Sequence, residues 1–113
     1  MSGKRTVVPT PAQVLWRAAD IIGERGWCRG ALTDADGRVC TEGAILLAAQ
    51  DGLKRPSLTA DTSDARHRAA WDALGAVAEE TDEVISLWND RQRDQRPVVS
   101  LLRRTARKLE AVR

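Results

Sequence analysis

The sequence predicts a mainly α fold: a compact four-helix domain with a short β-ribbon or loop between the first two helices. Three observations lead to this fold class. Ala, Leu and Val supply most of the apolar residues, a balance that favours helix over sheet. Apolar residues recur at helical spacing in several segments, and capping residues stand where those segments begin. At 113 residues the chain has the length of one domain, which we place at residues 9–113 after a disordered leader at 1–8.

The first helix is predicted from Thr10 to about Arg25. Thr10 is a suitable N-cap, Pro11 suits the first helical position, and Gly26 is a suitable C-cap. An apolar stripe runs along it, formed by Val14, Leu15, Ala18, Ile21 and Ile22. Trp16 lies off this stripe, so we expect it to cover a second element or to be exposed.

Residues 27–40 predict a two-stranded ribbon or an irregular loop. Asp36-Gly37 is a hairpin-turn signal, and residues 29–32 are then able to pair with residues 38–40. Both alternatives place both cysteines of the chain, Cys28 and Cys40, at the two ends of this segment.

A compact second helix is predicted over residues 42–51, with Thr41 as its cap and Gly52 as its stop. The run from Ala44 to Ala49 is apolar nearly all round, which predicts a central, buried helix.

Two further helices complete the predicted domain. Overlapping caps at residues 61–63 precede a helix at about 64–80, and residues 84–88 form either a short helix or an extended segment. Asp94 is the predicted N-cap of the last helix, with Pro97 tolerated in its first turn. The apolar side of that helix is predicted to hold Val98, Leu101, Leu102, Leu109 and Val112.

The charge is distributed unevenly along the chain. Residues 1–29 carry five basic and two acidic groups, residues 30–90 five and twelve, and residues 91–113 eight and two. This polarity suits self-association, a protein partner of mixed charge, or a basic patch for nucleic acid; a solvated helix face is the alternative. The candidate partner surface consists of Trp16, Arg103, Arg104, Arg107 and Lys108.

The sequence predicts a cytoplasmic protein. Its longest apolar run is too short to cross a bilayer, and no hydrophobic segment follows the basic residues of the N-terminus. In that compartment the thiols stay reduced. We expect no cofactor, no metal and no membrane contact.

The two cysteines allow four interpretations. Eleven residues separate Cys28 from Cys40, which is not a zinc-knuckle spacing. With His67 they supply three ligands, so zinc would need Asp36 or Asp90 as a fourth. A disulfide would close the ribbon, against the inferred compartment. Two reduced cysteines packed as small hydrophobic groups are the third interpretation.

A catalytic thiol is the fourth interpretation. Cys40 precedes a predicted helix, whose N-terminal N–H groups and dipole would lower its pKa. His67 would be the base and Asn89 or Asp90 the orienting group. However, His67 lies between Arg66 and Arg68 in a first turn that is predicted to be exposed.

Trp88-Asn89-Asp90 also allows two interpretations. Trp88 fills part of the core while Asn89 or Asp90 caps a neighbouring helix or turn. Alternatively, the aromatic ring, amide and carboxylate hold a small polar ligand. In both cases the candidate cluster is Trp27, Cys28, Cys40, Trp88, Asn89 and Asp90.

These elements resemble an uncharacterised family of small proteins from actinobacteria and their phages. The residues that carry the resemblance are Gly26-Trp27-Cys28, Gly37, Cys40-x-x-Gly43-Ala44-Ile45 and Ile85-x-x-Trp88-Asn89-Asp90, followed by a capped helix. The chain departs from the family at Pro97, where members more often have an acidic residue. The resemblance implies an actinobacterial or phage origin and no particular activity.

The function predicted from the sequence is non-enzymatic protein–protein binding, either self-association or a host or cellular partner. Modulation of a host protein by a phage-borne protein is one form of it. One alternative is a thiol-dependent enzyme or polar-ligand domain centred on the Cys28/Cys40/Trp88-Asn89-Asp90 cluster. A second alternative is weak nucleic-acid binding through the basic last helix.

Overall fold

The computed structural model describes residues 8–50, 56 and 65–112. These residues form five helices: α1 (Pro11–Arg25), α2 (Thr41–Ala49), α3 (Ala65–Thr81), α4 (Ile85–Asp90) and α5 (Gln95–Ala111). The mainly helical prediction is confirmed, but the count of four is wrong because Ile85–Asp90 forms a helix of its own. Most of the expected leader, the caps expected at residues 61–63 and the stop expected at Gly52 lie outside the described residues.

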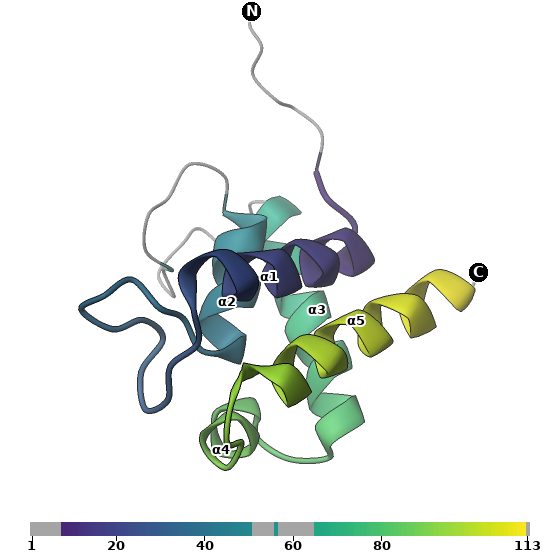
Figure 1. Ribbon diagram of the computed structural model, residues 1–113. Helices are drawn as coiled ribbons and strands as arrows, with labels where there is room; N and C mark the ends of the chain where they lie inside the picture. The colour runs from purple at the N-terminus through teal and green to yellow at the C-terminus, as the bar shows by residue number, and fades with distance from the viewer. Residues whose placement is uncertain (1–7, 51–55, 57–64, 113) are drawn as a thin grey trace, which may run out of the picture.

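The first and last helices lie side by side and run in opposite directions (Figure 1). α1 packs against α5, α2 and α3, while α3 crosses behind them and also contacts α5. α4 is at one end of the molecule, where it contacts α2 and α3. The loop between α1 and α2 projects to one side, and its base lies beside α2.

The sequence signals for α1 are confirmed. Thr10 accepts a hydrogen bond from the Gln13 backbone, and the Gln13 side chain accepts one from the Thr10 backbone, which completes a capping box. The whole predicted apolar stripe is buried. Gly26 ends the helix at φ +94°, and its N–H donates to the Ile22 carbonyl. A side chain at position 26 would also approach Arg38 Cγ within 2.9 Å.

The segment between α1 and α2 is an irregular loop rather than a ribbon. Among its residues only two isolated bridges form, and both involve Val39: a parallel one to Trp27 and an antiparallel one to Thr33. A turn forms one residue earlier than the Asp36-Gly37 signal indicates, since the Gly37 N–H donates to the Asp34 carbonyl and Ala35 and Asp36 are the central residues. The chain therefore pairs with Val39 from both sides without extending into strands.

α2 is the buried centre of the molecule, as its apolar run predicts. Ala44, Ile45 and Leu46 have no exposed surface. The predicted cap is wrong by one residue: Cys40 is the N-cap and Thr41 begins the helix. The helix ends at Ala49 with Gln50 as its C-cap, two residues before the expected end.

The stripes of α3 and α5 face the same core. Their buried apolar residues are Ala69, Ala70, Ala73, Leu74 and Val77 in α3 and Val98, Leu101, Leu102 and Ala106 in α5. Asp94 caps α5 by accepting from the Arg96 N–H, and Pro97 occupies the first turn, as expected. The assignment of Val112 to the apolar side is wrong, because Val112 follows the end of α5 and is 76% exposed.

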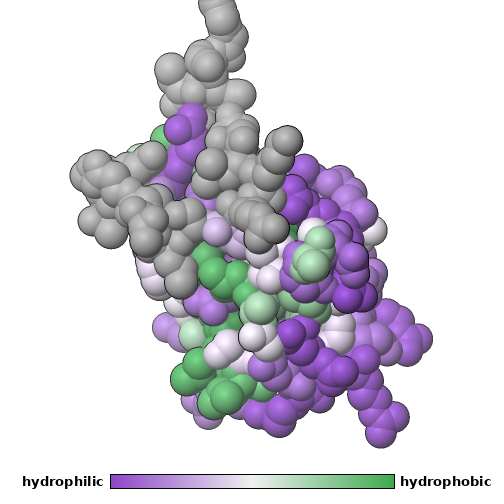
Figure 2. Space-filling view, turned by 90° about the vertical axis from the view of Figure 1, so that its left-hand side faces the viewer, coloured by the Kyte–Doolittle hydropathy of each residue, from purple (hydrophilic) through white to green (hydrophobic). Residues whose placement is uncertain are grey.

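Several large apolar side chains remain at the surface. Val84 and Leu87, at the start of α4, are 61% and 59% exposed, and Trp71 of α3 is 44% exposed. Figure 2 shows apolar side chains gathered in the lower part of the face that it draws, the end of the molecule where α4 lies. In the described parts of the chain, no helix is long and apolar enough to span a membrane.

Candidate functional site

Asn89 joins the loop, α2 and α4. Its side chain is completely buried, and its Oδ1 accepts from Trp27 Nε1 at 2.8 Å, from the Thr41 N–H at 2.9 Å and from Thr41 Oγ1 at 2.6 Å. Its Nδ2 donates to the Cys28 carbonyl at 3.2 Å and to Asp90 Oδ1 at 3.1 Å. Every donor and acceptor of the amide is therefore satisfied by the protein. The prediction that this amide caps a neighbouring helix is confirmed, since Thr41 is the first residue of α2.

Asp90 fixes the other side of the same loop. Its Oδ1 accepts from the Gly30 N–H at 3.0 Å and from the Asn89 amide. These hydrogen bonds, and then the nearby Arg29 charge, lower the pKa of Asp90. The carboxylate is thus ionised and bonded within the loop junction, so it does not serve as a general acid near neutral pH.

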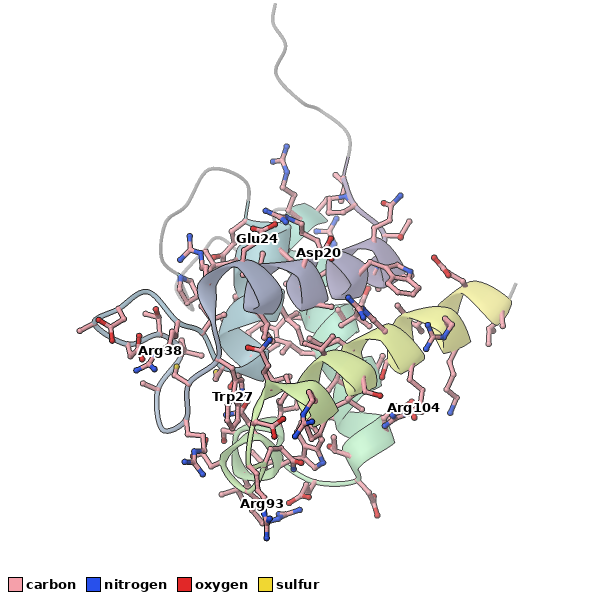
Figure 3. All side chains as sticks on the ribbon, in the orientation of Figure 1. Asp20, Glu24, Trp27, Arg38, Arg93 and Arg104 are labelled. Carbon is pink, nitrogen blue, oxygen red and sulfur yellow. The ribbon has the colours of Figure 1, made fainter. Side chains whose placement is uncertain are left out.

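Trp27 lies where the loop meets α4 (Figure 3). The Arg29 guanidinium stands 5.6 Å from the centre of its ring, a cation–π arrangement. Trp27 also lines a hollow of about 310 Å³ with Cys28, Arg29, Asp34 and Arg38. Arg38 forms ion pairs with Asp34 and Asp36 at its rim. Trp88 packs against the core and is partly buried, as predicted.

The structure argues against the interpretation of Cys40 as a catalytic thiol activated by α2. Cys40 Sγ is the side-chain cap of α2 and accepts from the Gly43 N–H at 3.3 Å. Backbone N–H groups do lower the thiol pKa, but burial has the larger and opposite effect and raises it to about 11. Cys40 is therefore a protonated thiol at neutral pH.

Cys28 is also a protonated thiol at neutral pH. Its Sγ lies 3.6 Å from the Ala31 carbonyl oxygen and 3.5 Å from that of Arg38, both suitable acceptors for the S–H group. Burial and then the Asp34 charge raise its pKa. Both cysteines are buried and free, so the disulfide interpretation is wrong and the packed, reduced form is the one observed.

His67 does not complete a catalytic triad. The expectation that it is exposed is wrong: it is 2% exposed, and its Nε2 accepts from Trp71 Nε1 at 2.8 Å. Its hydrogen-bond partner Trp71 is on α3, whereas Cys40 bonds to Gly43 and Asn89 to Thr41 and Trp27. The edge-to-face contact with Trp71 explains why the imidazole is covered at a position flanked by arginines.

The residues considered as zinc ligands, Cys28, Cys40 and His67 with Asp36 or Asp90, do not form a metal-binding cluster. Within the described residues, no three side chains of His, Cys, Asp or Glu lie close enough together to hold a metal ion. Asp36 pairs with Arg38 at the loop tip, and Asp90 bonds to Gly30.

The predicted partner surface on α5 is partly used within the molecule. Arg104 and Lys108 reach Glu80 of α3. Trp16 donates from Nε1 to Glu110 at 2.9 Å, and Arg107 lies over its ring at 5.6 Å. Trp16 therefore covers a second element, α5, which was one of its two expected roles. Figure 3 shows Arg104 on the side of α5 that faces α3.

Sequence analysis missed the surface of α3 and α4 that we call the Trp71–Leu87 surface, formed by Trp71, Val84 and Leu87. Trp71 and Val84 line a shallow groove of about 280 Å³, whose other lining residues are Glu42, Leu74, Gly75, Ala78, Ile85 and Ser86. A signal was present: Trp71, Leu74 and Ala78 recur at positions i, i+3 and i+7, which extends the apolar stripe of α3 beyond its core residues.

A family model described as a family of unknown function (DUF6197) matches residues 6–108. The chain belongs to this family. Comparison with curated proteins and with solved structures found no match.

Proposed function

We propose that this protein is non-enzymatic and acts by binding another protein chain through the Trp71–Leu87 surface. The observation that carries the proposal is the exposure of Trp71 and Val84 at one groove, together with the exposure of Leu87, which follows the groove-lining residues Ile85 and Ser86 in α4. Large apolar side chains that gather at the surface are typical of interaction sites, and Trp is prominent among the residues that dominate binding energy. Burying one such side chain completely contributes about 1.5–3 kcal/mol, so covering the exposed halves of these three contributes about 2–4 kcal/mol toward binding a partner, which must supply further contacts.

The chemistry of the buried cluster supports a non-enzymatic role. The two thiols have raised pKa values, and the amide and carboxylate of Asn89 and Asp90 bond to the loop. Nucleic-acid binding through the last helix is less well supported, because Arg104 and Lys108 pair with Glu80. The proposal includes a cytoplasmic location and an actinobacterial or phage origin, which rests on the Gly-Trp-Cys, Cys-x-x-Gly-Ala and Trp-Asn-Asp elements.

Self-association is the first form of the proposal to test. Sedimentation velocity of the full chain over a wide concentration range is compared with that of Leu87→Asp and of Val112→Asp. Val112 is a matched control, since it is an exposed apolar residue at the far end of α5. We expect concentration-dependent association that Leu87→Asp abolishes and Val112→Asp leaves unchanged.

If the wild type is strictly monomeric, the next experiment looks for a different protein as the partner. Proximity labelling in the cells of origin is then run with the same three proteins. A labelled protein must bind the purified wild type and the Val112→Asp variant, and must lose affinity for Leu87→Asp by at least tenfold. If the wild type is monomeric and no protein shows that dependence on Leu87, the proposal is wrong.

A further inference from the structure

A straight row of arginines runs along α5 on its outer side. Arg96, Arg103 and Arg107 are seven and four residues apart, a spacing that returns to the same face of a helix, and Ser100 lies between them. At about 1.5 Å per residue the row is about 16 Å long. Arg93, in the linker before α5, continues it beyond the start of the helix.

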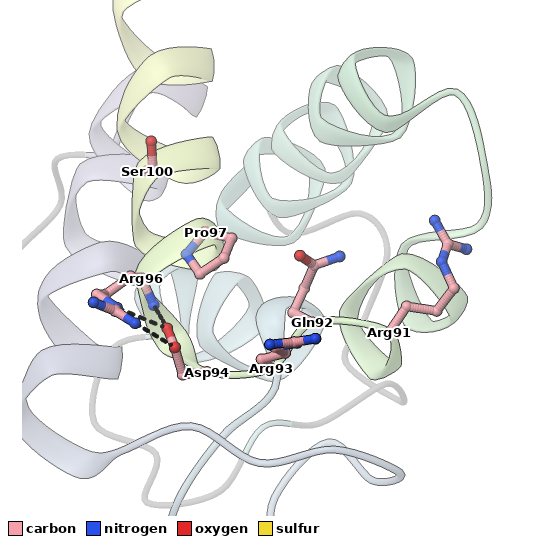
Figure 4. A pocket seen from close by; sticks show the side chains of 7 residues that line it. All are labelled: Arg91, Gln92, Arg93, Asp94, Arg96, Pro97 and Ser100. Atoms are coloured by element: carbon pink, nitrogen blue, oxygen red, sulfur yellow. Dashed lines mark hydrogen bonds and ion pairs between the residues drawn. The ribbon is translucent and has the colours of Figure 1, made fainter.

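Two adjoining grooves follow this row. One, of about 540 Å³, is lined by Arg91, Gln92, Arg93, Asp94, Arg96, Pro97 and Ser100. The other, of about 400 Å³, is lined by Gln95, Arg96, Val99, Ser100, Arg103 and Arg107. The grooves share Arg96 and Ser100, and Asp94 is the only acidic residue among their lining residues. Figure 4 shows Arg93 and Arg96 on either side of Asp94, with Arg91 turned away towards the other end of the groove.

The charges along the row are only partly neutralised. Arg91 forms an ion pair with Glu83, and Arg96 with Asp94. Arg107 lies over the Trp16 ring, whose Nε1 donates to the Glu110 carboxylate, and it forms no ion pair of its own among the described residues. Arg93 and Arg103 have no carboxylate partner among the described residues. The middle and the N-terminal end of the row therefore carry excess positive charge.

We propose that the row Arg93–Arg96–Arg103–Arg107 binds an acidic helix of a protein partner. A helix that carries carboxylates at positions i, i+4, i+7 and i+11 presents them at the spacing of Arg96, Ser100, Arg103 and Arg107, so that three carboxylates face arginines and one faces the Ser100 hydroxyl. Guanidinium groups pair with carboxylates through two parallel hydrogen bonds, which fixes the register of the two helices. Pro97 and Val99 give the grooves an apolar floor that suits the aliphatic parts of a peptide.

The surroundings of the row favour a peptide over a nucleic acid. Acidic residues flank it: Glu80 lies by Arg104 and Lys108, and Glu83 by Arg91. A nucleic-acid backbone, with its broad field of phosphates, would meet these carboxylates. The lining of the two grooves also contains no aromatic ring on which a base is able to stack.

This inference is independent of the Trp71–Leu87 surface, which lies on α3 and α4. The probe is a labelled, Ala-rich helical peptide with glutamates at i, i+4, i+7 and i+11. Its twin has glutamines at the same positions. Fluorescence anisotropy compares the wild type with Arg93→Gln/Arg103→Gln and with Arg17→Gln. Arg17 is an exposed helix arginine on α1 and is the matched control. A single-stranded and a duplex DNA of random sequence are the competing probes.

The expected result is binding of the glutamate peptide that the double variant weakens about five- to tenfold and Arg17→Gln leaves unchanged. Binding should also weaken as ionic strength rises from about 0.05 to about 0.5 M. The inference is overturned by no binding of the glutamate peptide, by equal binding of its glutamine twin, or by equal affinity of the double variant. It is likewise overturned if either DNA binds more tightly than the peptide with the same dependence on Arg93 and Arg103. None of these outcomes affects the Leu87 test.

Discussion

Asn89 and Leu87 are two residues apart on the same short helix, α4, and they differ in both burial and polarity. Asn89 is completely buried, and its amide makes five hydrogen bonds to the loop, to α2 and to Asp90. Leu87 is apolar and 59% exposed. The usual distribution, with apolar residues inside and polar ones outside, is reversed at both positions.

This reversal distinguishes the residues that hold the fold together, around Asn89, from the exposed apolar residues of the Trp71–Leu87 surface. The hydrogen-bonding positions of the Asn89 amide are all filled by the protein, so the amide offers none to a ligand. The apolar groups of the Trp71–Leu87 surface have no comparable cover. A motif rich in Trp, Cys, Asn and Asp is therefore the internal support of the fold, whereas ordinary apolar residues are the candidates for an interaction.

Replacing Asn89 should produce the largest loss of stability. In Asn89→Ala the Thr41 N–H and hydroxyl, the Trp27 N–H and the Cys28 carbonyl lose their common partner in a buried place. Each buried polar group without a partner costs about 1–3 kcal/mol, so we expect a loss of about 3–5 kcal/mol in the free energy of unfolding. Urea denaturation measures it.

Gln92→Ala is the matched amide control for this measurement. The Gln92 side chain donates to the Trp88 carbonyl at 2.8 Å from a partly exposed position, so we expect a loss below about 1 kcal/mol. If both variants were equally stable, the amide of Asn89 would not hold the loop to α2, and the site would have to be considered open to a ligand.

Gly43→Ala tests the other contact at this junction. A Cβ at position 43 would lie 2.2 Å from the Leu32 carbonyl oxygen, which must shift although it accepts from the Cys40 N–H. We expect a loss of about 2–4 kcal/mol from this overpacking. Gly23→Ala is the control, because nothing lies within 4 Å of a Cβ there and α1 should gain about 0.5–1 kcal/mol. A neutral Gly43→Ala in thermal unfolding would show that the loop is free to move away from α2.

Much of the fold was predictable because local rules decide it. Thr10 and Asp94 were recognisable caps, and the stripes of α1 and α5 follow the helical period. The apolar run of α2 correctly indicated its buried position. Local rules failed at Cys40, because a thiol is an uncommon cap and the neighbouring Thr41 has the stronger preference.

The arrangement of the candidate site was less predictable because contacts across the chain decide it. The Trp-Asn-Asp element was recognisable, yet the partners of Asn89 other than Asp90 lie 48 to 62 residues away. The burial of His67 depends on Trp71 one turn later and on packing that a charged sequence neighbourhood conceals. The exposure of Leu87 follows only from the direction in which α4 meets α3.

Cys40 gives the stability a dependence on alkaline pH. Its pKa is about 11 in the folded chain against an ordinary value of 9.0, so the folded state holds the proton more tightly. The contribution of Cys40 to the free energy of unfolding is therefore fully present below pH 9. It decreases as the pH rises from 9 to about 11, because only the thiol of the unfolded chain ionises in that range. This difference of about two pKa units corresponds to a loss of roughly 2–3 kcal/mol in the free energy of unfolding.

The measurement compares the wild type with Cys40→Ala by urea denaturation across this pH range. The variant lacks the thiol, so we expect its curve to be flatter, although its stability is lower at neutral pH because α2 loses its cap. Iodoacetamide should label neither Cys28 nor Cys40 until the chain unfolds. Rapid labelling of the folded protein at neutral pH would contradict the burial of the thiols and restore the enzyme interpretation.

Leu87→Asp should change stability least, although it alters the same helix as Asn89→Ala. The side chain is largely exposed, and a carboxylate in the first turn of α4 lies near the positive end of a helix. We expect a change within about 0.5 kcal/mol, measured by urea denaturation at low protein concentration. The difference from Asn89→Ala would then show that apolar exposure at position 87 contributes nothing to folding. A loss above about 2 kcal/mol would instead mean that Leu87 supports the packing of α4 on α3, and the case for a binding surface would have to rest on Trp71 and Val84 alone.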